Sequence, residues 1–450
     1  MQTVQTQITG KHRAKIGSNQ VASKETAEHI ERERVKALNL HTLGPGALAV
    51  GEWEAAGLEL PDQTHIRRYR LERVRAELRK FDYAGVVLYD PLNVRYATDS
   101  TNMQLWITHN AARYAFVPTE GPVIMFDYHS TQFLSDHSEV VDETRVATSW
   151  FYFSAGDRYQ EKAEKWAEEI ADLVAQYGGG NKRIAIDRCN PEAFEALQSH
   201  GIGVFNGEQL MERARQVKCD EEIKAMRCAI HACDQAMEVM RTKMVPGISE
   251  QRLWSYLHAE NIARGGEWIE TRIMAAGPRC NPWFQECSSY EIQSGEFVAF
   301  DTDLIGSYGV CVDISRTWIC GDVKPTDEQR EIYDMAYEQI QRNTEWLKPG
   351  LSFKELSFDS HQYDPNEFGH YSCLYHGVGL CDEYPSICFP AAWENHGLDD
   401  VLIPGMVVCV ESYMGRHSGG PGVKLEDQVL ITETGHELLS HYPIQEILTN

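Results

Sequence analysis

The sequence lacks the features of membrane and secreted proteins. No apolar run in its 450 residues approaches the roughly 20 residues that a transmembrane helix needs. The polar segment before Val50 contains no apolar stretch of the kind that a signal peptide requires. None of the 12 cysteines belongs to a Cys-x-x-Cys pair, which argues against a zinc ribbon. We therefore expect a cytoplasmic protein whose cysteines are mostly buried and reduced.

Positive charge is also scarce. The chain has 42 lysines and arginines against 67 acidic residues, which gives a formal net charge of −25. Such a surface repels nucleic-acid phosphates and anionic membranes, so neither is expected as a partner. The hydrophobic content of 42% is sufficient for substantial cores, and the length favours two domains.

Residues 1–62 are predicted to be an N-terminal extension. A charged helical stretch at 25–40 is followed by Gly44, Pro45 and Gly46. This segment has too few apolar residues to form a core of its own. We expect it to remain separate or to pack on another surface, such as a second subunit.

Residues 63–212 are predicted to form an α/β domain, because helical and apolar strand-like segments alternate there. The helices are expected at 65–81 and 159–177, and the strands at 85–89, 114–118, 123–127 and 183–187. Residues 213–450 are predicted to form the second domain. It opens with a long helix at 220–242, which Pro246 and Gly247 bring to an end.

Two short motifs occur twice in the second domain, in the same order. Met244–Ser249 resembles Leu347–Ser352, and Ile292–Asp301 resembles Leu402–Glu411. In the second pair, a glycine turn enters an apolar strand that ends in an acid. The repeat predicts a duplicated helix–strand unit whose two final acids face each other across a pseudo-twofold axis.

Acidic residues and one histidine occur at or near the ends of apolar segments in this domain. They are Asp301, Asp303, Asp313, His376, Glu411 and Glu426. Taken singly, each could be an ordinary turn residue. Together, buried acids would repel one another unless a cation lay between them. Carboxylates with one imidazole suit divalent cations, and bridging carboxylates can hold two of them. Asp427 is left open as a turn acid or as a support for this site.

These segments resemble the five motifs of the pita-bread metallopeptidase family, which includes methionine aminopeptidase, aminopeptidase P, prolidase and creatinase. The motifs here are Phe300–Asp303, Asp313–Thr317, His376–Gly379, Gly405–Glu411 and Lys424–Asp427. The resemblance is strong over about residues 210–440. It implies an α+β fold, in which a pita-bread catalytic domain with an internal pseudo-twofold follows a creatinase/prolidase-type α/β N-terminal domain.

The same resemblance implies a pair of divalent metal ions and a homodimer. The metal ligands that it implies are Asp301, Asp313, His376, Glu411 and Glu426.

The sequence departs from the peptidase pattern at three places. Trp283 stands where the peptidases carry a histidine after a proline, and Asp382-Glu-Tyr-Pro385 replaces their His-Glu-x-Pro run. Asp303 replaces the glycine that the peptidases usually carry two residues after the first ligand, Asp301. This combination resembles the metal-dependent dimethylsulfoniopropionate (DMSP) lyases, a non-peptidase branch of the fold. That resemblance implies Asp303 as a sixth ligand, Asp382 as the catalytic base and iron as the metal.

The expected substrate is then a small zwitterion with a sulfonium group, which β-elimination converts to dimethyl sulfide and acrylate. Trp283 and Tyr371 are candidates to hold the sulfonium, since aromatic faces attract cations. Tyr371 is also a candidate to orient the base. Tyr375 and the cluster Trp150–Phe153 are further aromatic candidates, with core packing as the alternative.

Two other functions remain open. An Xaa-Pro aminopeptidase or prolidase is compatible with the intact ligand set, although both peptidase histidines are missing. A non-enzymatic binding module built on a decayed pita-bread pocket would be expected to lose metal ligands, and this chain keeps six candidates.

Overall fold

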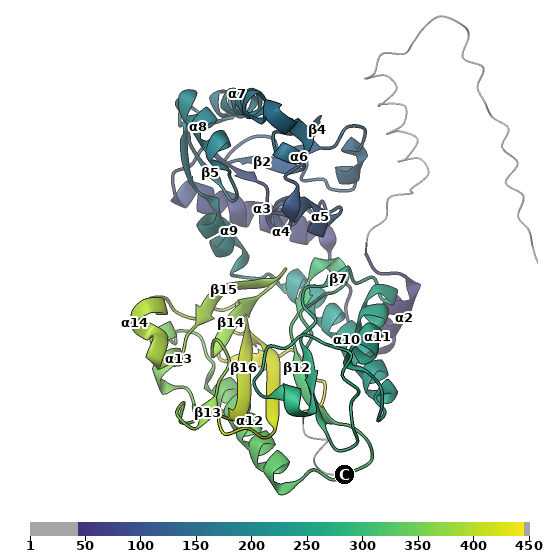
Figure 1. Cartoon of the computed structure of the whole chain (residues 1–450). Helices are drawn as coiled ribbons and strands as arrows, with labels where there is room; N and C mark the ends of the chain where they lie inside the picture. Colours follow the sequence, from purple (N-terminus) through teal and green to yellow (C-terminus); the bar gives the residue numbers. More distant parts are fainter. Residues whose placement is uncertain (1–43, 445–450) are drawn as a thin grey trace, which may run out of the picture. The chain divides into compact units, whose positions relative to one another are not determined.

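The computed structural model describes residues 44–444 (Figure 1). The helix predicted at 25–40 lies outside them. No helix among the described residues is long and apolar enough to cross a membrane. All twelve cysteines are free, as the sequence predicts.

The first half of the described chain is a six-stranded sheet covered by helices on both faces (Figure 1). The strand order is β4-β3-β2-β1-β5-β6. The strands are β1 (Gly85–Leu88), β2 (Tyr114–Pro118), β3 (Ile124–Asp127), β4 (Glu143–Val146), β5 (Arg183–Ile186) and β6 (Gly203–Asn206). The helices are α3 (Gln63–Lys80), α4 (Pro91–Thr98), α5 (Gln104–His109), α6 (Tyr152–Ala155), α7 (Tyr159–Tyr177), α8 (Pro191–Ser199) and α9 (Gly207–Arg215).

Alternation along β1 explains the two layers of helices. Val86 and Leu88 belong to a core shared with α3, α4 and α9, whereas Val87 belongs to a core shared with α7 and α8. Successive residues of a strand point to opposite faces, so a continuous apolar run marks a strand that is buried on both sides. The predicted α/β domain is therefore present. The predicted domain boundary between residues 212 and 213 remains a prediction. It falls inside helix α9.

The second half carries three further sheets and four long or medium helices, α10–α13 (Figure 1). The helices, with short α14, are α10 (Asp220–Lys243), α11 (Glu250–Ala263), α12 (Asp327–Trp346), α13 (Phe353–Asp359) and α14 (Trp393–His396). The strands up to residue 319 are β7 (Trp268–Ile269), β8 (Met274–Ala276), β9 (Phe297–Asp301), β10 (Leu304–Ile305), β11 (Cys311–Val312) and β12 (Ser315–Ile319). The later strands are β13 (Phe368–Gly369), β14 (Tyr375–Val378), β15 (Asp382–Ile387), β16 (Val407–Arg416), β17 (Gly422–Ile431) and β18 (His436–Leu438).

The backbone confirms the predicted internal repeat. The N–H of Gly247 donates to the carbonyl of Ile292, and the N–H of Gly350 donates to the carbonyl of Leu402, both at 2.8 Å. In each repeat, these bonds tie the turn between two helices to the glycine turn that precedes the acid-bearing strand.

Strand pairing repeats in the same way. Ala275 of β8 lies opposite Ala299 of β9, and His376 of β14 lies opposite Cys409 of β16. Both of these pairs stand two residues before the final acid of the longer strand. The sheets β8-β9-β12 and β14-β16-β17 are therefore equivalent units, related by the predicted pseudo-twofold.

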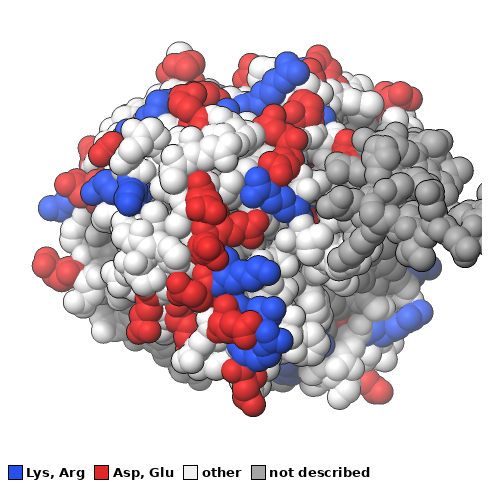
Figure 2. Space-filling model, turned by 90° about the horizontal axis from the view of Figure 1, so that it is seen from above, with Lys and Arg blue, Asp and Glu red and all other residues white. Residues whose placement is uncertain are grey.

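Acidic and basic side chains are interspersed on the face drawn in Figure 2. Elsewhere among the surface charges, Arg145 pairs with Glu143 and Arg158 with Glu161. The face in Figure 2 therefore carries both signs of charge.

The described end of the N-terminal extension packs on the second half of the same chain. Helix α2 (Ala47–Ala55) buries Trp53 completely, next to Cys228 of α10. Trp53 also stacks on Tyr308 at a ring-centroid distance of 5.8 Å. Residues 308–312 form an apolar run in the sequence. Tyr308 nevertheless adopts a left-handed φ of 65° in a short 3₁₀ turn, and β11 starts only at Cys311.

Replacing Trp53 with alanine is expected to lower the free energy of unfolding by about 3–5 kcal/mol, because it leaves a cavity where a buried indole was. Chemical denaturation followed by far-ultraviolet circular dichroism measures this. Leu48→Ala is the control, since Leu48 lies on the same helix and is 49% exposed. Equal effects of the two substitutions would show that α2 is not anchored through Trp53.

Candidate metal centre

The six predicted metal ligands come together where the two repeats meet. Asp301 ends β9, His376 lies in β14, and Glu411 and Glu426 lie opposite each other in β16 and β17. Asp303 and Asp313 lie just before β10 and just after β11. All six are at most 9% exposed. Five of the six contribute to two compact groups of ligand atoms, one with His376 and Glu426 and the other with Asp301 and Asp303, and Asp313 belongs to both. Glu411 joins them through its Oε1, 3.2 Å from His376 Nε2.

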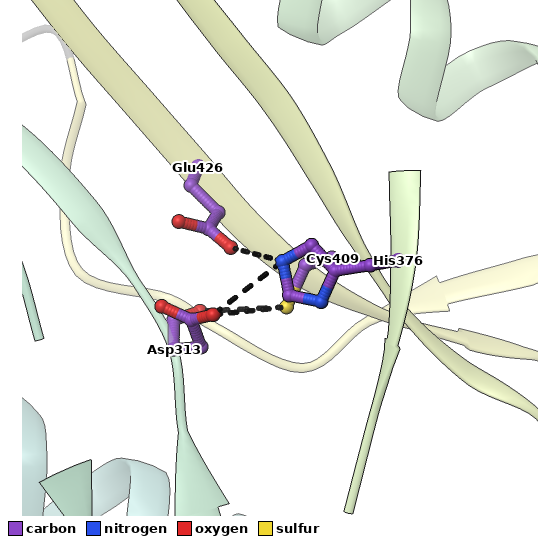
Figure 3. A group of neighbouring side chains, drawn as sticks. All are labelled: Asp313, His376, Cys409 and Glu426. Carbon is purple, nitrogen blue, oxygen red and sulfur yellow. Dashed lines mark hydrogen bonds and ion pairs between the residues drawn. The ribbon is translucent and has the colours of Figure 1, made fainter. Parts of the chain in front are cut away.

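His376 presents one ring nitrogen to the acids. Its Nε2 lies 3.2 Å from Glu411 Oε1, 3.4 Å from Glu426 Oε1 and 3.5 Å from Asp313 Oδ2; Figure 3 shows the last two contacts. Its Nδ1 lies 3.1 Å from the carbonyl oxygen of Gly377. With the proton on Nδ1 donated to that carbonyl, Nε2 is left with a lone pair directed at the carboxylates, as in a metal-binding histidine.

The second group contains only carboxylates. Asp303 has a left-handed φ of 34° and accepts a hydrogen bond of 2.5 Å from Thr271 Oγ1. The Oδ1 atoms of Asp301 and Asp313 are buried and accept no hydrogen bond within the described part of the chain. Burial, followed by the charge of the neighbouring acids, raises the pKa of Asp303 and Asp313 well above their ordinary range. A bound cation removes this penalty, so the residues fit a pair of divalent ions.

Lys424 is a central residue that the sequence reasoning used only as part of a motif. Its buried Nζ lies 2.7 Å from Glu411 Oε2, 2.8 Å from Glu426 Oε2 and 3.2 Å from Asp301 Oδ2. It thus bridges acids of both repeats. The available signal was its place two residues before Glu426 in β17, since alternate residues of a strand share a face.

Asp382 lies at the open side of the centre. Its Oδ1 is 3.6 Å from His376 Nδ1, and its side chain is 60% exposed. The next residue, Glu383, is fully buried and contacts Lys218 Nζ at 2.9 Å and Arg215 Nε at 3.1 Å. Glu383 also accepts the N–H of Leu380 at 3.0 Å. These contacts tie the start of β15 to the α9–α10 connection and hold Asp382 beside His376.

Aromatic rings line one side of the centre. Tyr371 lies under the Lys424 ammonium, 4.3 Å from ring centroid to Nζ, and stacks on Phe284 at 5.0 Å. Trp283 is 7% exposed and stacks at 6.1 Å on Tyr413, which shares a face of β16 with Glu411. Phe284 was missed from the sequence, although it follows Trp283 directly.

The other aromatic candidates lie elsewhere. Tyr375 shares a hydrogen bond of 2.7 Å with Ser360 and points away from the face of β14 that carries His376, so it is a core residue. Trp150 is buried in the first-half core. Tyr152 and Phe153 are 65% and 77% exposed and belong to that half as well.

Comparison with known proteins agrees with this geometry. Residues 224–433 match metallopeptidase family M24, and residues 70–228 match the creatinase/prolidase N-terminal domain. The chain is 48% identical to a dimethylsulfoniopropionate lyase DddP of Roseovarius nubinhibens, over 90% of this chain and 92% of that protein. A second DddP lyase, from Roseobacter denitrificans, is 44% identical over 91% of this chain and 93% of its own length.

The chain belongs to this DddP family. An Xaa-Pro dipeptidase from Bacillus anthracis has a similar structure, with a TM-score of 0.68 at 24% identity, covering 84% of this chain and 98% of that one. At such identity, the likeness establishes the fold alone. The predicted fold is therefore confirmed: a creatinase-type N-terminal domain precedes a pita-bread catalytic domain. Family M24 depends on a pair of metal ions, and the buried cluster of acids and His376 fits such a pair.

Removal of bound metal is expected to lower the melting temperature. Without cations, the buried carboxylates repel one another, and a ligand that binds only the folded state stabilises it by mass action. Differential scanning calorimetry before and after dialysis against a chelator, with elemental analysis of both samples, measures the effect. Adding back a divalent metal should restore the melting temperature. A chelated protein free of metal and unchanged in stability would contradict the assignment.

Glu383→Gln is expected to destabilise the fold by about 3–5 kcal/mol at neutral pH, since it leaves the buried Lys218 without a negative partner and leaves Arg215 with Glu212 alone. Burial alone would raise the pKa of Glu383, but Lys218 and Arg215 outweigh it, so the pKa lies below 4.5. A carboxylate whose pKa is lower in the folded than in the unfolded state stabilises the fold at pH values above the unfolded-state pKa. This stabilisation is lost as the pH falls through the folded-state pKa. The difference between wild type and variant should therefore shrink on acidification below pH 4.5. A difference independent of pH would contradict the ion pairing.

Proposed function

We propose that the protein is a metal-dependent lyase that cleaves DMSP to dimethyl sulfide and acrylate by β-elimination. The supporting observation is the 48% and 44% identity to two DMSP lyases over nine-tenths of the chain. It is joined by a carboxylate, Asp382, at 3.6 Å from the histidine of the candidate metal centre.

In this proposal the six residues of the centre hold two divalent ions. They are Asp301, Asp303, Asp313, His376, Glu411 and Glu426. Bound ions would supply Lewis acidity toward the substrate carboxylate and so make its α-hydrogen more acidic. We propose iron as the metal, with action in the cytoplasm as a homodimer.

Asp382 acts as the base. It takes the proton from the α-carbon, the C–H electron pair becomes the C=C bond of acrylate, and the C–S bond breaks with its electrons on sulfur. Dimethyl sulfide leaves as a neutral molecule, so the leaving group needs no proton. Because the Asp382 side chain is 60% exposed, it can return the proton to water and begin a new cycle.

The aromatic wall suits the cationic end of the substrate. The ring of Tyr371 already takes the Lys424 ammonium at 4.3 Å, and a sulfonium is attracted to a ring face in the same way. Trp283 and Phe284 extend this wall. Tyr371 is also proposed to orient the base.

An Xaa-Pro peptidase is the second candidate. The solved peptidase structures support it through the fold alone, at 24% identity or below. Peptide hydrolysis requires proton delivery to a leaving amine. This chain lacks both histidines of the peptidases. Trp283 occupies the position of one, and Asp382 begins the segment in which the peptidases carry the other.

Asp382→Asn is expected to lower the rate of DMSP cleavage by roughly 10²–10⁴-fold while leaving the metal content unchanged. Headspace gas chromatography of dimethyl sulfide and elemental analysis on the same sample measure both. Asp399→Asn, at another exposed position, is the control. Full activity of the Asp382 variant would end the assignment of the base. Release of proline from Gly-Pro by wild type, without dimethyl sulfide from DMSP, would favour the peptidase.

A further inference from the structure

A thiol faces the candidate metal centre beside the predicted ligands. Cys409 lies in β16 two residues before Glu411, so both side chains lie on the same face of the strand. It pairs with His376 across β14 and β16 and is 0% exposed. Figure 3 shows its sulfur between His376 and Asp313.

The spacing of the surrounding atoms suits coordination of one ion. Cys409 Sγ lies 3.9 Å from Asp313 Oδ2, and His376 Nε2 lies 3.5 Å from that oxygen and 3.4 Å from Glu426 Oε1. All four ligand atoms lie within 4.8 Å of one another. Metal bonds of about 2.0–2.3 Å in a tetrahedral arrangement place the ligand atoms roughly 3.3–3.8 Å apart. The three measured separations lie in or close to this range.

The hydrogen bonding also leaves these atoms available to a metal. Glu426 is 0% exposed, and its Oε1, which points at His376 in Figure 3, accepts no hydrogen bond within residues 44–444. The two contacts of Cys409 Sγ with Asp313, 3.8 Å to the carbonyl oxygen and 3.9 Å to Oδ2, are long. Neither the thiol nor this carboxylate oxygen would give up a strong hydrogen bond on binding an ion.

We propose that Cys409 is a ligand of the metal ion on the His376 side of the centre. The inference rests on the proposed metal binding and deepens it. The sulfur binds as a thiolate, and its proton passes to solvent. The two metal positions then differ in chemistry: one combines sulfur and nitrogen with carboxylate oxygen, and the other has the oxygens of Asp301, Asp303 and Asp313. The position with sulfur favours softer metals such as zinc, cobalt and cadmium, and the oxygen position favours harder ones such as manganese.

Cobalt substitution tests the proposal, because a sulfur–Co²⁺ bond gives a charge-transfer band in the near ultraviolet. Full-length protein freed of metal and reloaded with Co²⁺ is expected to show this band. Cys409→Ser and Cys409→Ala are expected to lose the band while retaining bound cobalt. Cys388→Ser, which changes another buried cysteine, is the control and should keep the band.

The wild-type measurement keeps the test decisive if the variants fail to fold. Wild type that binds cobalt and cleaves DMSP without a charge-transfer band would overturn the role of Cys409 and leave the proposed function standing. Wild type that binds neither cobalt nor another divalent metal and releases no dimethyl sulfide from DMSP would overturn both. A band that persists in folded Cys409→Ser would also overturn the assignment, since the sulfur would then belong to another residue.

Discussion

The structure of the second half depends on negative charge buried where the two repeats meet. Its five carboxylates are all at most 9% exposed; they belong to Asp301, Asp303, Asp313, Glu411 and Glu426. Such a group is stable only with positive charge among its members. The chain supplies part of that charge through Lys424, which contacts Glu411 and Glu426. The unbonded oxygens of Asp301 and Asp313 mark where further cations fit.

Around this centre the fold provides rigid supports. Glu383 is bonded to Lys218 and Arg215 behind Asp382. Arg316, 1% exposed, donates to Asp427 Oδ1 at 2.7 Å and to the carbonyl of Glu426 at 2.6 Å. Asp427, left open by the sequence, is thus a support of the neighbouring Glu426. Ion pairs on the far side of the ligand-bearing strands restrict how far the site side chains can move.

The sequence was most informative where local chemistry and strand periodicity coincide. The repeat and the clustering of the six ligand candidates were predictable because charged residues in or beside apolar segments stand out against the expected pattern. Glu411 and Glu426, expected at or near the ends of such segments, lie instead in the middle of β16 and β17. The conformation of Tyr308 was not predictable, since a left-handed turn stabilised by stacking on Trp53 depends on a contact far away in the chain. Lys424 was missed as a member of the site for a similar reason. A lysine in an apolar strand reveals its function only when the acids of two other strands, β9 and β16, are placed around it.

The duplication has one consequence for how a small substrate can lie. Ala275 and Ala299 occupy in the first repeat the places that His376 and Cys409 occupy in the second. A pocket with equal halves would accept a molecule with a negative head and a positive tail in two opposite directions. Because the imidazole of His376 and the thiol of Cys409 occur in the second repeat and alanines in the first, the two halves of the pocket differ chemically. That difference lets a symmetric framework tell the two ends of a zwitterion apart.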